Sequence, residues 1–303
     1  MVFLTILLGL MPSFLLVGLG GLLRNRLSAN AWQGLDRLNF EILFPALLFV
    51  AASGRPIAPA QVIAIAPLVW AILLSGLLAG ALARRFGPQR FLDFAGCWQT
   101  AWRFNTALGF VAVGTLSRAD AGLLAVTVGM AVPVANLFAV TALSRGNALG
   151  LRATLVKVVL NPFLLASVAG VLVGLSGWSV PAPVLAPLKM LAQAAIPVAL
   201  ISIGATMNWG ALARLDRFSA MLTGTKLVLL PALVCAAALI TGASGPLVAV
   251  LVLFAALPTA SAAHVLASGF GANRELVATL IAQSTLLSAA TLPVWITVAE
   301  LLF

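Results

Sequence analysis

The chain has 303 residues, of which 62% are hydrophobic and only 8% are charged, and its mean hydropathy is +1.15. Soluble domains carry about 25% charged residues to cover their surface, so the composition excludes a soluble enzyme or a nucleic-acid-binding domain. The net charge of +10 would indicate a polyanionic partner in a soluble protein, and in this chain it needs another explanation.

Apolar segments follow one another along the whole chain. Each is close to the roughly 20 residues that a helix needs to cross a bilayer, and their continuous hydrophobicity is unlike the alternating pattern of a β-barrel. The first segment lacks the basic start of a signal peptide, so we expect it to remain in the mature protein. We predict ten spanning helices, numbered here as spans 1 to 10, at residues 2–23, 35–53, 60–83, 91–115, 119–143, 153–176, 185–207, 218–241, 246–269 and 275–302.

The positive charge is concentrated in every second loop between these spans. The even-numbered loops contain only Arg55 and Arg118. Because cytoplasmic loops collect Lys and Arg, we predict an integral membrane protein whose odd-numbered loops are cytoplasmic and whose two termini are outside. These odd loops hold eleven of the 17 Lys and Arg residues, namely Arg24, Arg26, Arg84, Arg85, Arg90, Arg145, Arg152, Lys157, Arg214, Arg217 and Arg274.

The two halves of the chain resemble each other. The sequence Pro12-Ser-Phe-Leu-Leu parallels Pro162-Phe-Leu-Leu 150 residues later, and Phe44-Pro-Ala-Leu-Leu parallels Ile196-Pro-Val-Ala-Leu 152 residues later. Five spans in each half place the halves in opposite senses across the membrane, which is a recurrent transporter architecture. We therefore predict two inverted repeats, at residues 1–150 and 151–303.

Polar residues lie near the middle of spans 4 and 9, where such repeats interrupt their helices. In span 9, Pro258 removes a backbone donor, and Thr259 and Ser261 follow it. The position 152 residues before Pro258 is Thr106, which ends the polar stretch Arg103-Phe-Asn105-Thr106 in span 4. We predict that both helices break here and that these residues bind substrate.

Arg103 is expected near the bilayer centre, where a charge is costly unless it faces protein or water and is paired. The functional interpretation is a fixed cation that attracts an anionic substrate. The alternative is a structural pair with a carboxylate or with backbone carbonyls freed by the break. Asn105 and Thr106 have the same two interpretations, because an amide can bind a carboxylate or cap a helix.

Other polar residues fall inside apolar spans. Asn136 is a candidate for the substrate site, although interhelical hydrogen bonding is the alternative. His264 is the only histidine, and an imidazole can carry a coupling proton near neutral pH; Gln283 and Ser284 are further coupling candidates. At the start of span 2, the sequence predicts charges at the membrane interface, with an ion pair across four residues. These charges are Asp36, Arg37 and Glu41.

Small residues and cysteines inside the spans indicate packing. Gly76-x-x-x-Gly80 and Gly170-x-x-x-Gly174 fit close helix contacts, either within one chain or in a dimer. Cys97 and Cys235 form neither a disulfide framework nor a metal motif. We expect no metal and no cofactor.

Motifs along nearly the whole chain resemble one family. The chain resembles the auxin efflux carrier family in its compact bacterial form, which implies a bacterial inner membrane. Plant members have Asn-Pro-Asn where this chain has Arg103-Phe104-Asn105, so auxin itself is not implied as the substrate. The motifs are Gly20-Gly-Leu-Leu-Arg, Leu38-Asn39, Leu43-Phe-Pro-Ala-Leu-Leu, Arg103-Phe-Asn-Thr, Asn136, Asn161-Pro162, Pro197-Val-Ala-Leu with Gly204, Lys226 with Pro231, Pro258-Thr-Ala and Ser284-Thr-Leu-Leu-Ser with Pro293.

The resemblance implies a fold as well as a function. It implies a 5+5 inverted repeat in which interrupted helices 4 and 9 cross, as in bile-acid/sodium symporters and sodium/proton carriers. Spans 1, 2, 6 and 7 would form a scaffold, spans 3–5 and 8–10 a moving transport bundle, and two chains a homodimer. Members move organic anions.

The leading interpretation is a secondary transporter, and not an enzyme, that carries a small organic anion such as a carboxylate by elevator-type alternating access. A proton or sodium would drive uptake, whereas export could follow the membrane potential alone. A sodium- or proton-coupled cation carrier on the same fold is one alternative, but no carboxylate falls at a span centre. A non-transporting sensor or assembly protein is another. An intramembrane enzyme lacks its catalytic constellation.

Overall fold

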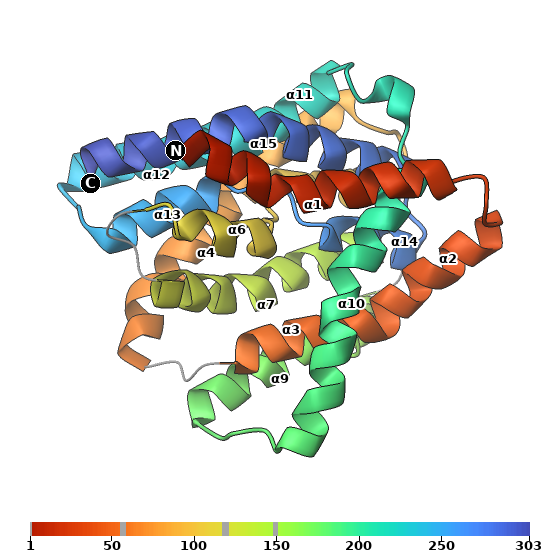
Figure 1. The fold of residues 1–303 in the computed structure, drawn as a ribbon, viewed down its shortest axis with the longest axis horizontal. Helices are drawn as coiled ribbons and strands as arrows, with labels where there is room; N and C mark the ends of the chain where they lie inside the picture. The colour runs from red at the N-terminus through yellow and green to blue at the C-terminus, as the bar shows by residue number, and fades with distance from the viewer. Residues whose placement is uncertain (1, 55–58, 117–120, 148–150) are drawn as a thin grey trace.

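The computed structural model describes residues 2–54, 59–116, 121–147 and 151–303, and its described elements are all helices (Figure 1). This confirms the all-helical class. Arg55 and Arg118 lie outside the described residues, as do residues 148–150 at the predicted boundary between the repeats.

Helices occupy all ten of the predicted intervals, several of them divided into two pieces. The first half contains α1 (Val2–Leu23), α2 (Ala29–Leu38), the π-helix η1 (Asn39–Leu43), α3 (Phe44–Ser53), α4 (Pro59–Ala81), η2 (Leu82–Phe86), α5 (Phe91–Trp98), η3 (Gln99–Ala101), α6 (Thr106–Val113) and α7 (Ala121–Gly146). The second half contains α8 (Leu151–Val159), α9 (Pro162–Ser176), α10 (Ala182–Thr206), η4 (Trp209–Ala211), α11 (Arg217–Gly224), the π-helix η5 (Thr225–Leu229), α12 (Leu230–Thr241), α13 (Pro246–Ala256), α14 (Ala262–Phe270) and α15 (Arg274–Leu302).

Several helices are long and apolar enough to cross a membrane. Among the described residues, five meet that requirement in length and composition: Val62–Phe86, Gly122–Gly146, Ala182–Thr206, Arg217–Thr241 and Arg274–Leu302. The remaining intervals hold shorter or divided apolar helices. The chain is therefore an integral membrane protein, and the ten-span arrangement stays a prediction.

Helices α1, α3, α9 and α10 pack closely on one another, and α10 crosses both α1 and α3 (Figure 1). The contact between α1 and α10 depends on glycine, because a Cβ atom at Gly204 would overlap the carbonyl of Val17. A Cβ atom at Gly170 would lie 2.8 Å from the carbonyl oxygen of Phe49, so α9 and α3 also approach backbone to backbone. Gly170 thus makes a contact within one chain.

The cation-rich loops lie together at one end of the molecule. The backbone N–H of Asn273 donates to Asp93, and Asn147 donates to the carbonyl of Phe270. Two further contacts extend this group: Arg90 donates to the carbonyl of Gly271, and Arg24 and Trp209 line one surface cavity. At the opposite end, the N–H of Gly245 donates to the carbonyl of Phe303, and the two termini lie near each other (Figure 1).

Candidate functional site

The first helix interruption lies in the polar stretch of span 4. Helix α5 continues into η3, the chain then runs extended, and α6 starts at Thr106. No proline causes this break. Instead, Asn105 adopts an extended conformation and its side-chain oxygen accepts from the N–H of Leu108 at 3.1 Å, which caps α6.

The second interruption lies between α13 and α14. Pro258 follows Leu257, whose backbone is extended with ψ of 139°, as expected for a residue before proline. Helix α14 resumes at Ala262 after Ser261. The structure therefore interrupts both helices at the stretches that the sequence singles out.

The two interruptions cross, and each satisfies backbone groups that the other leaves free. The N–H of Asn105 donates to the carbonyl of Pro258 at 2.8 Å. The hydroxyl of Thr259 donates to the carbonyl of Thr100 at 2.6 Å, while the N–H of Thr259 donates to Ser284 at 3.0 Å. Two interruptions leave four helix ends in a buried position, where unpaired backbone groups are costly. These hydrogen bonds pair some of the backbone groups that the helix ends leave free.

A buried lysine lies at the C-terminal end of α13, beside the crossing, where it opposes the partial negative charge of that helix end. The Lys226 ammonium, in the π-helix η5, donates to the carbonyl of Ala255 at 2.7 Å in the last turn of α13. A cation near a helix C-terminus opposes the partial negative charge there. From the sequence, Lys226 contributes only to the family resemblance. A lysine inside an apolar span was the signal that marks it as a functional candidate.

Arg103 is buried beside the crossing and lacks a carboxylate partner. Its side chain is 5% exposed, and one guanidinium nitrogen donates to the side-chain oxygen of Asn136 at 3.0 Å. Asn136 in turn faces Ser167 and the carbonyl of Phe163 on α9. Among the described residues, the second terminal nitrogen of Arg103 has no hydrogen-bond partner and no Asp or Glu pairs with it. The site therefore holds an unmatched donor.

A cavity of about 250 Å³ adjoins this arginine. Its polar lining comes from Arg103, Asn105, Thr106 and Ser261. Its walls are mostly apolar, with Phe44, Leu48, Phe104, Phe110 and Val132 among them. The N-terminal ends of α6 and α14, which carry partial positive charge, border the same space. The arrangement suits a small molecule with an anionic group and an apolar remainder.

A second cavity, of about 240 Å³, also adjoins the crossing. Asn105 and Ser261 line both cavities, whereas Thr259 lines only the second. Helices α1, α10 and α15 supply most of its other lining, which is again largely apolar. Asn105 and Ser261 are thus placed to contact a ligand in either cavity.

The remaining predicted site residues lie around the cavities or away from them. Pro258 and Ser284 contribute to the crossing, and Asn136 stands behind Arg103 without lining the cavity. Gln283 donates to the carbonyls of Ala211 and Arg214, each at 3.1 Å, and so holds a loop. His264 belongs to a separate polar cluster.

That cluster surrounds Asp36, which is 1% exposed. Its carboxylate accepts from Arg274 and from Ser268, both at 2.9 Å, and from Ser202. The His264 ring nitrogen Nε2 lies 3.5 Å from the same carboxylate. We call these five residues, Asp36, Ser202, His264, Ser268 and Arg274, the Asp36 cluster.

Asp36 is buried within the protein, which the sequence did not predict for this charge, and its depth in the membrane stays a prediction. The predicted ion pair between Arg37 and Glu41 is confirmed, with an exposed contact of 2.8 Å. The sequence spacing could have predicted the burial of Asp36, because positions 32, 36 and 39 fall on one face of a helix. Trp32, Asp36 and Asn39 are all buried. Arg37 points away from that face.

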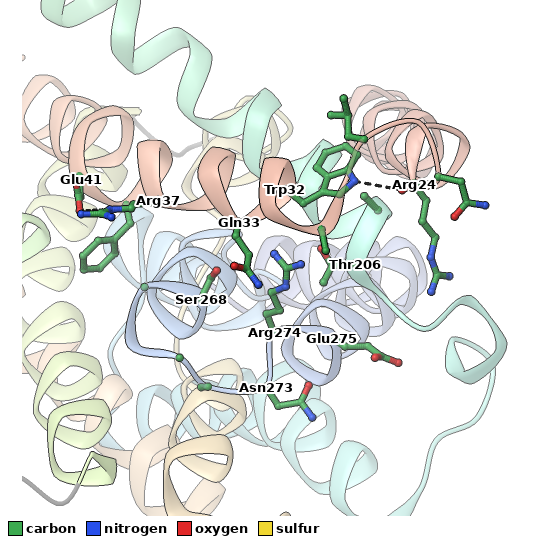
Figure 2. A pocket seen from close by; sticks show the side chains of 18 residues that line it. Arg24, Trp32, Gln33, Arg37, Glu41, Thr206, Ser268, Asn273, Arg274 and Glu275 are labelled. Carbon is green, nitrogen blue, oxygen red and sulfur yellow. Dashed lines mark hydrogen bonds and ion pairs between the residues drawn. The ribbon is translucent and has the colours of Figure 1, made fainter.

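A polar hollow of about 1050 Å³ lies at the end of the molecule that carries the cation-rich loops. Trp32, Gln33, Thr206, Ser268 and Arg274 are among its lining residues (Figure 2). Figure 2 shows Arg274 and Ser268 extending from the α14–α15 region toward α2. The Asp36 cluster therefore lies at the inner wall of this hollow.

An apolar helical chain with a buried polar site at two interrupted helices is typical of membrane transport proteins. Residues 147–296 match the family model described as membrane transport protein. This match covers just under half of the chain, and together with two transporter relatives it confirms the resemblance to the auxin efflux carriers.

Two relatives agree with this assignment. The chain is 25% identical over 271 residues to an "Uncharacterized transporter" of Methanothermobacter thermautotrophicus, an alignment that covers 86% of this chain and 87% of the relative. It is 30% identical over 136 residues to a "Putative malonate transporter" of Rhizobium meliloti, covering 45% of this chain and 42% of that relative.

Proposed function

We propose that the protein is a secondary transporter of a small organic anion, with a carboxylate as the bound group. The observation that carries this proposal is the unmatched donor of Arg103. A guanidinium forms strong, oriented hydrogen bonds to carboxylates, and Arg103 already presents one free nitrogen beside a cavity of about 250 Å³. The malonate named for one relative supports an anionic substrate.

The proposal includes the ten-span inverted repeat and elevator-type alternating access. In this arrangement α1, α2–α3, α8–α9 and α10 form the scaffold, and the other helices carry the crossing as a transport bundle. The family resemblance adds that two chains form a homodimer. The close glycine contacts of α1 with α10 and of α9 with α3 support a rigid scaffold. Movement of the bundle would carry Arg103 and its anion between the two sides.

The alternative of a cation carrier has less support. Cation carriers need carboxylates at the binding site, and the described residues that line the two cavities include none. A proton or sodium remains a candidate coupling ion, and His264 is the candidate proton carrier. Asp36 lies 3.5 Å from its Nε2 atom and would be the partner of a protonated His264.

Purified protein in liposomes tests the proposal. We expect exchange of at least one radiolabelled mono- or dicarboxylate, measured with and without proton and sodium gradients. Arg103→Gln should reduce the exchange about tenfold or more, because a charge-assisted bond contributes roughly 1.5–3 kcal/mol and 1.4 kcal/mol is about tenfold.

The exposed Arg37→Gln variant is the matched control, since it removes the same charge away from both cavities. Robust cation flux without exchange of any organic anion would overturn the proposal. Normal anion exchange by a folded Arg103→Gln variant would remove Arg103 from the site.

A further inference from the structure

The Asp36 cluster joins the predicted scaffold to the predicted moving bundle. Asp36 on α2 and Ser202 on α10 belong to the scaffold of the proposed function. His264 and Ser268 on α14 and Arg274 at the start of α15 belong to the transport bundle. His264, Ser268 and Arg274 of the bundle all contact the carboxylate of Asp36, whose two oxygens accept from both parts.

The cluster lies between the crossing and the polar hollow. Helix α14 has nine residues and so extends about 13 Å at 1.5 Å per residue. It begins beside Ser261 at the crossing and ends beside the hollow, which Ser268 and Gly269 line. His264 and Ser268 face Asp36 along this length. The scaffold therefore contacts α14 between the hollow and the crossing.

The ion pair between Asp36 and Arg274 opposes the separation of α2 from α14 and α15. Asp36 is 1% exposed, whereas Arg274 is 24% exposed and reaches the hollow. If α14 and α15 moved away from α2, Asp36 would lose the Arg274 guanidinium and the Ser268 hydroxyl, both at 2.9 Å in the closed arrangement. An unpaired buried charge is strongly unfavourable. The ion pair therefore stabilises the closed arrangement. Breaking it is most unfavourable for Asp36, because Asp36 is the more buried partner.

We propose that Asp36 is a gating residue, and that its ion pair with Arg274 holds the passage between the polar hollow and the crossing closed. Ser202, Ser268 and His264 position the carboxylate for this pair. The proposal rests on the proposed function in one respect, because it takes α14 and α15 as part of a moving bundle. It assigns a role to a carboxylate outside both substrate cavities.

Thiol labelling tests the gate without knowledge of the substrate. Cys97 and Cys235 are first replaced by Ala, and Ala260→Cys then places a single thiol in the cavity lining. A membrane-impermeant maleimide is applied to vesicles from the side that carries the Arg274 loop. We expect Asp36→Asn and Arg274→Gln each to raise the labelling rate about tenfold or more, because each removes the pair that closes the passage.

Two further variants keep the test decisive. The double variant Asp36→Asn with Arg274→Gln leaves no buried charge unpaired, so it should fold even if a single variant does not, and it should label fast. Arg37→Gln, which lines the same hollow and breaks an exposed pair, should label at the parent rate.

The outcomes separate the two proposals. Parent-like labelling in the double variant would overturn the gate, whatever anion exchange shows. Fast labelling in a protein that exchanges no organic anion would leave the gate standing and overturn the proposed substrate class.

Discussion

The single side chain that decides the chemistry of the site is Arg103, and its partner is an amide. Asn136 holds one guanidinium nitrogen through its side-chain oxygen and leaves the positive charge unneutralised. The sequence predicted that Arg103 lies among polar residues and left open a structural pair with a carboxylate. Among the described residues the structure provides no such carboxylate.

Replacing this amide by a carboxylate should inactivate the site. In Asn136→Asp the carboxylate would pair with Arg103 at the same position, so the substrate anion would have to compete with an internal one. We expect anion exchange in liposomes to fall about tenfold or more, which corresponds to roughly 1.4 kcal/mol, while thermal unfolding changes little. The matched control is Asn208→Asp, which introduces the same charge at an exposed helix cap.

Unchanged exchange in a folded Asn136→Asp variant would contradict an anion site at Arg103. The sequence could not assign this pairing, because a distance of 33 residues between Asn136 and Arg103 says nothing about which helix faces meet. The same limit applies to Asp36, whose partners lie up to 238 residues away.

At the scale of the helix, the interruptions were predictable to different degrees. Pro258 marks its break directly, since proline cannot donate to a helix. The break at Asn105 has no such marker and depends on a side-chain cap. Span 6 is also divided, because Asn161 caps α9 and Pro162 starts it. The π-helices η1 and η5 have no marker in the pattern of apolar residues.

The crossing itself should be sensitive to one hydroxyl. Thr259→Val keeps the shape of the side chain but leaves the buried carbonyl of Thr100 without its donor. An unsatisfied buried group costs about 1–3 kcal/mol, so we expect a clear loss of thermal stability in detergent. Thr241→Val is the control, because its exposed hydroxyl bonds only to its own helix. Equal stability of the two variants would show that the crossing does not depend on this bond.

At the scale of the whole molecule, the charge pattern and the packing agree. Loops that the sequence predicts on one side of the membrane contact one another through Asn273 with Asp93, Arg90 with Gly271 and Asn147 with Phe270. The carbonyl of the C-terminal Phe303 contacts an even-numbered loop at the opposite end, at Gly245. The excess of positive charge thus marks one end of the molecule, independently of any ligand.

Site-directed thiol labelling tests the predicted orientation of that end. In a background with Cys97 and Cys235 replaced by Ala, single cysteines are placed at exposed positions in four loops. The positions, taken in chain order, are Ser28, Ser179, Ala213 and Ser244. If Lys- and Arg-rich loops are cytoplasmic, an impermeant maleimide added outside intact cells should label the cysteines at positions 179 and 244. It should not label those at positions 28 and 213.

Inside-out vesicles should give the reverse pattern, which controls for poor reactivity at any one position. The pair Ala213 and Ser244 is the most informative, because only the helix from α11 to α12 separates them. Labelling of both from the same side would mean that this helix does not cross the membrane. The ten-span count would then fail. With one crossing fewer the number of crossings would be odd, and the two termini would lie on opposite sides of the membrane.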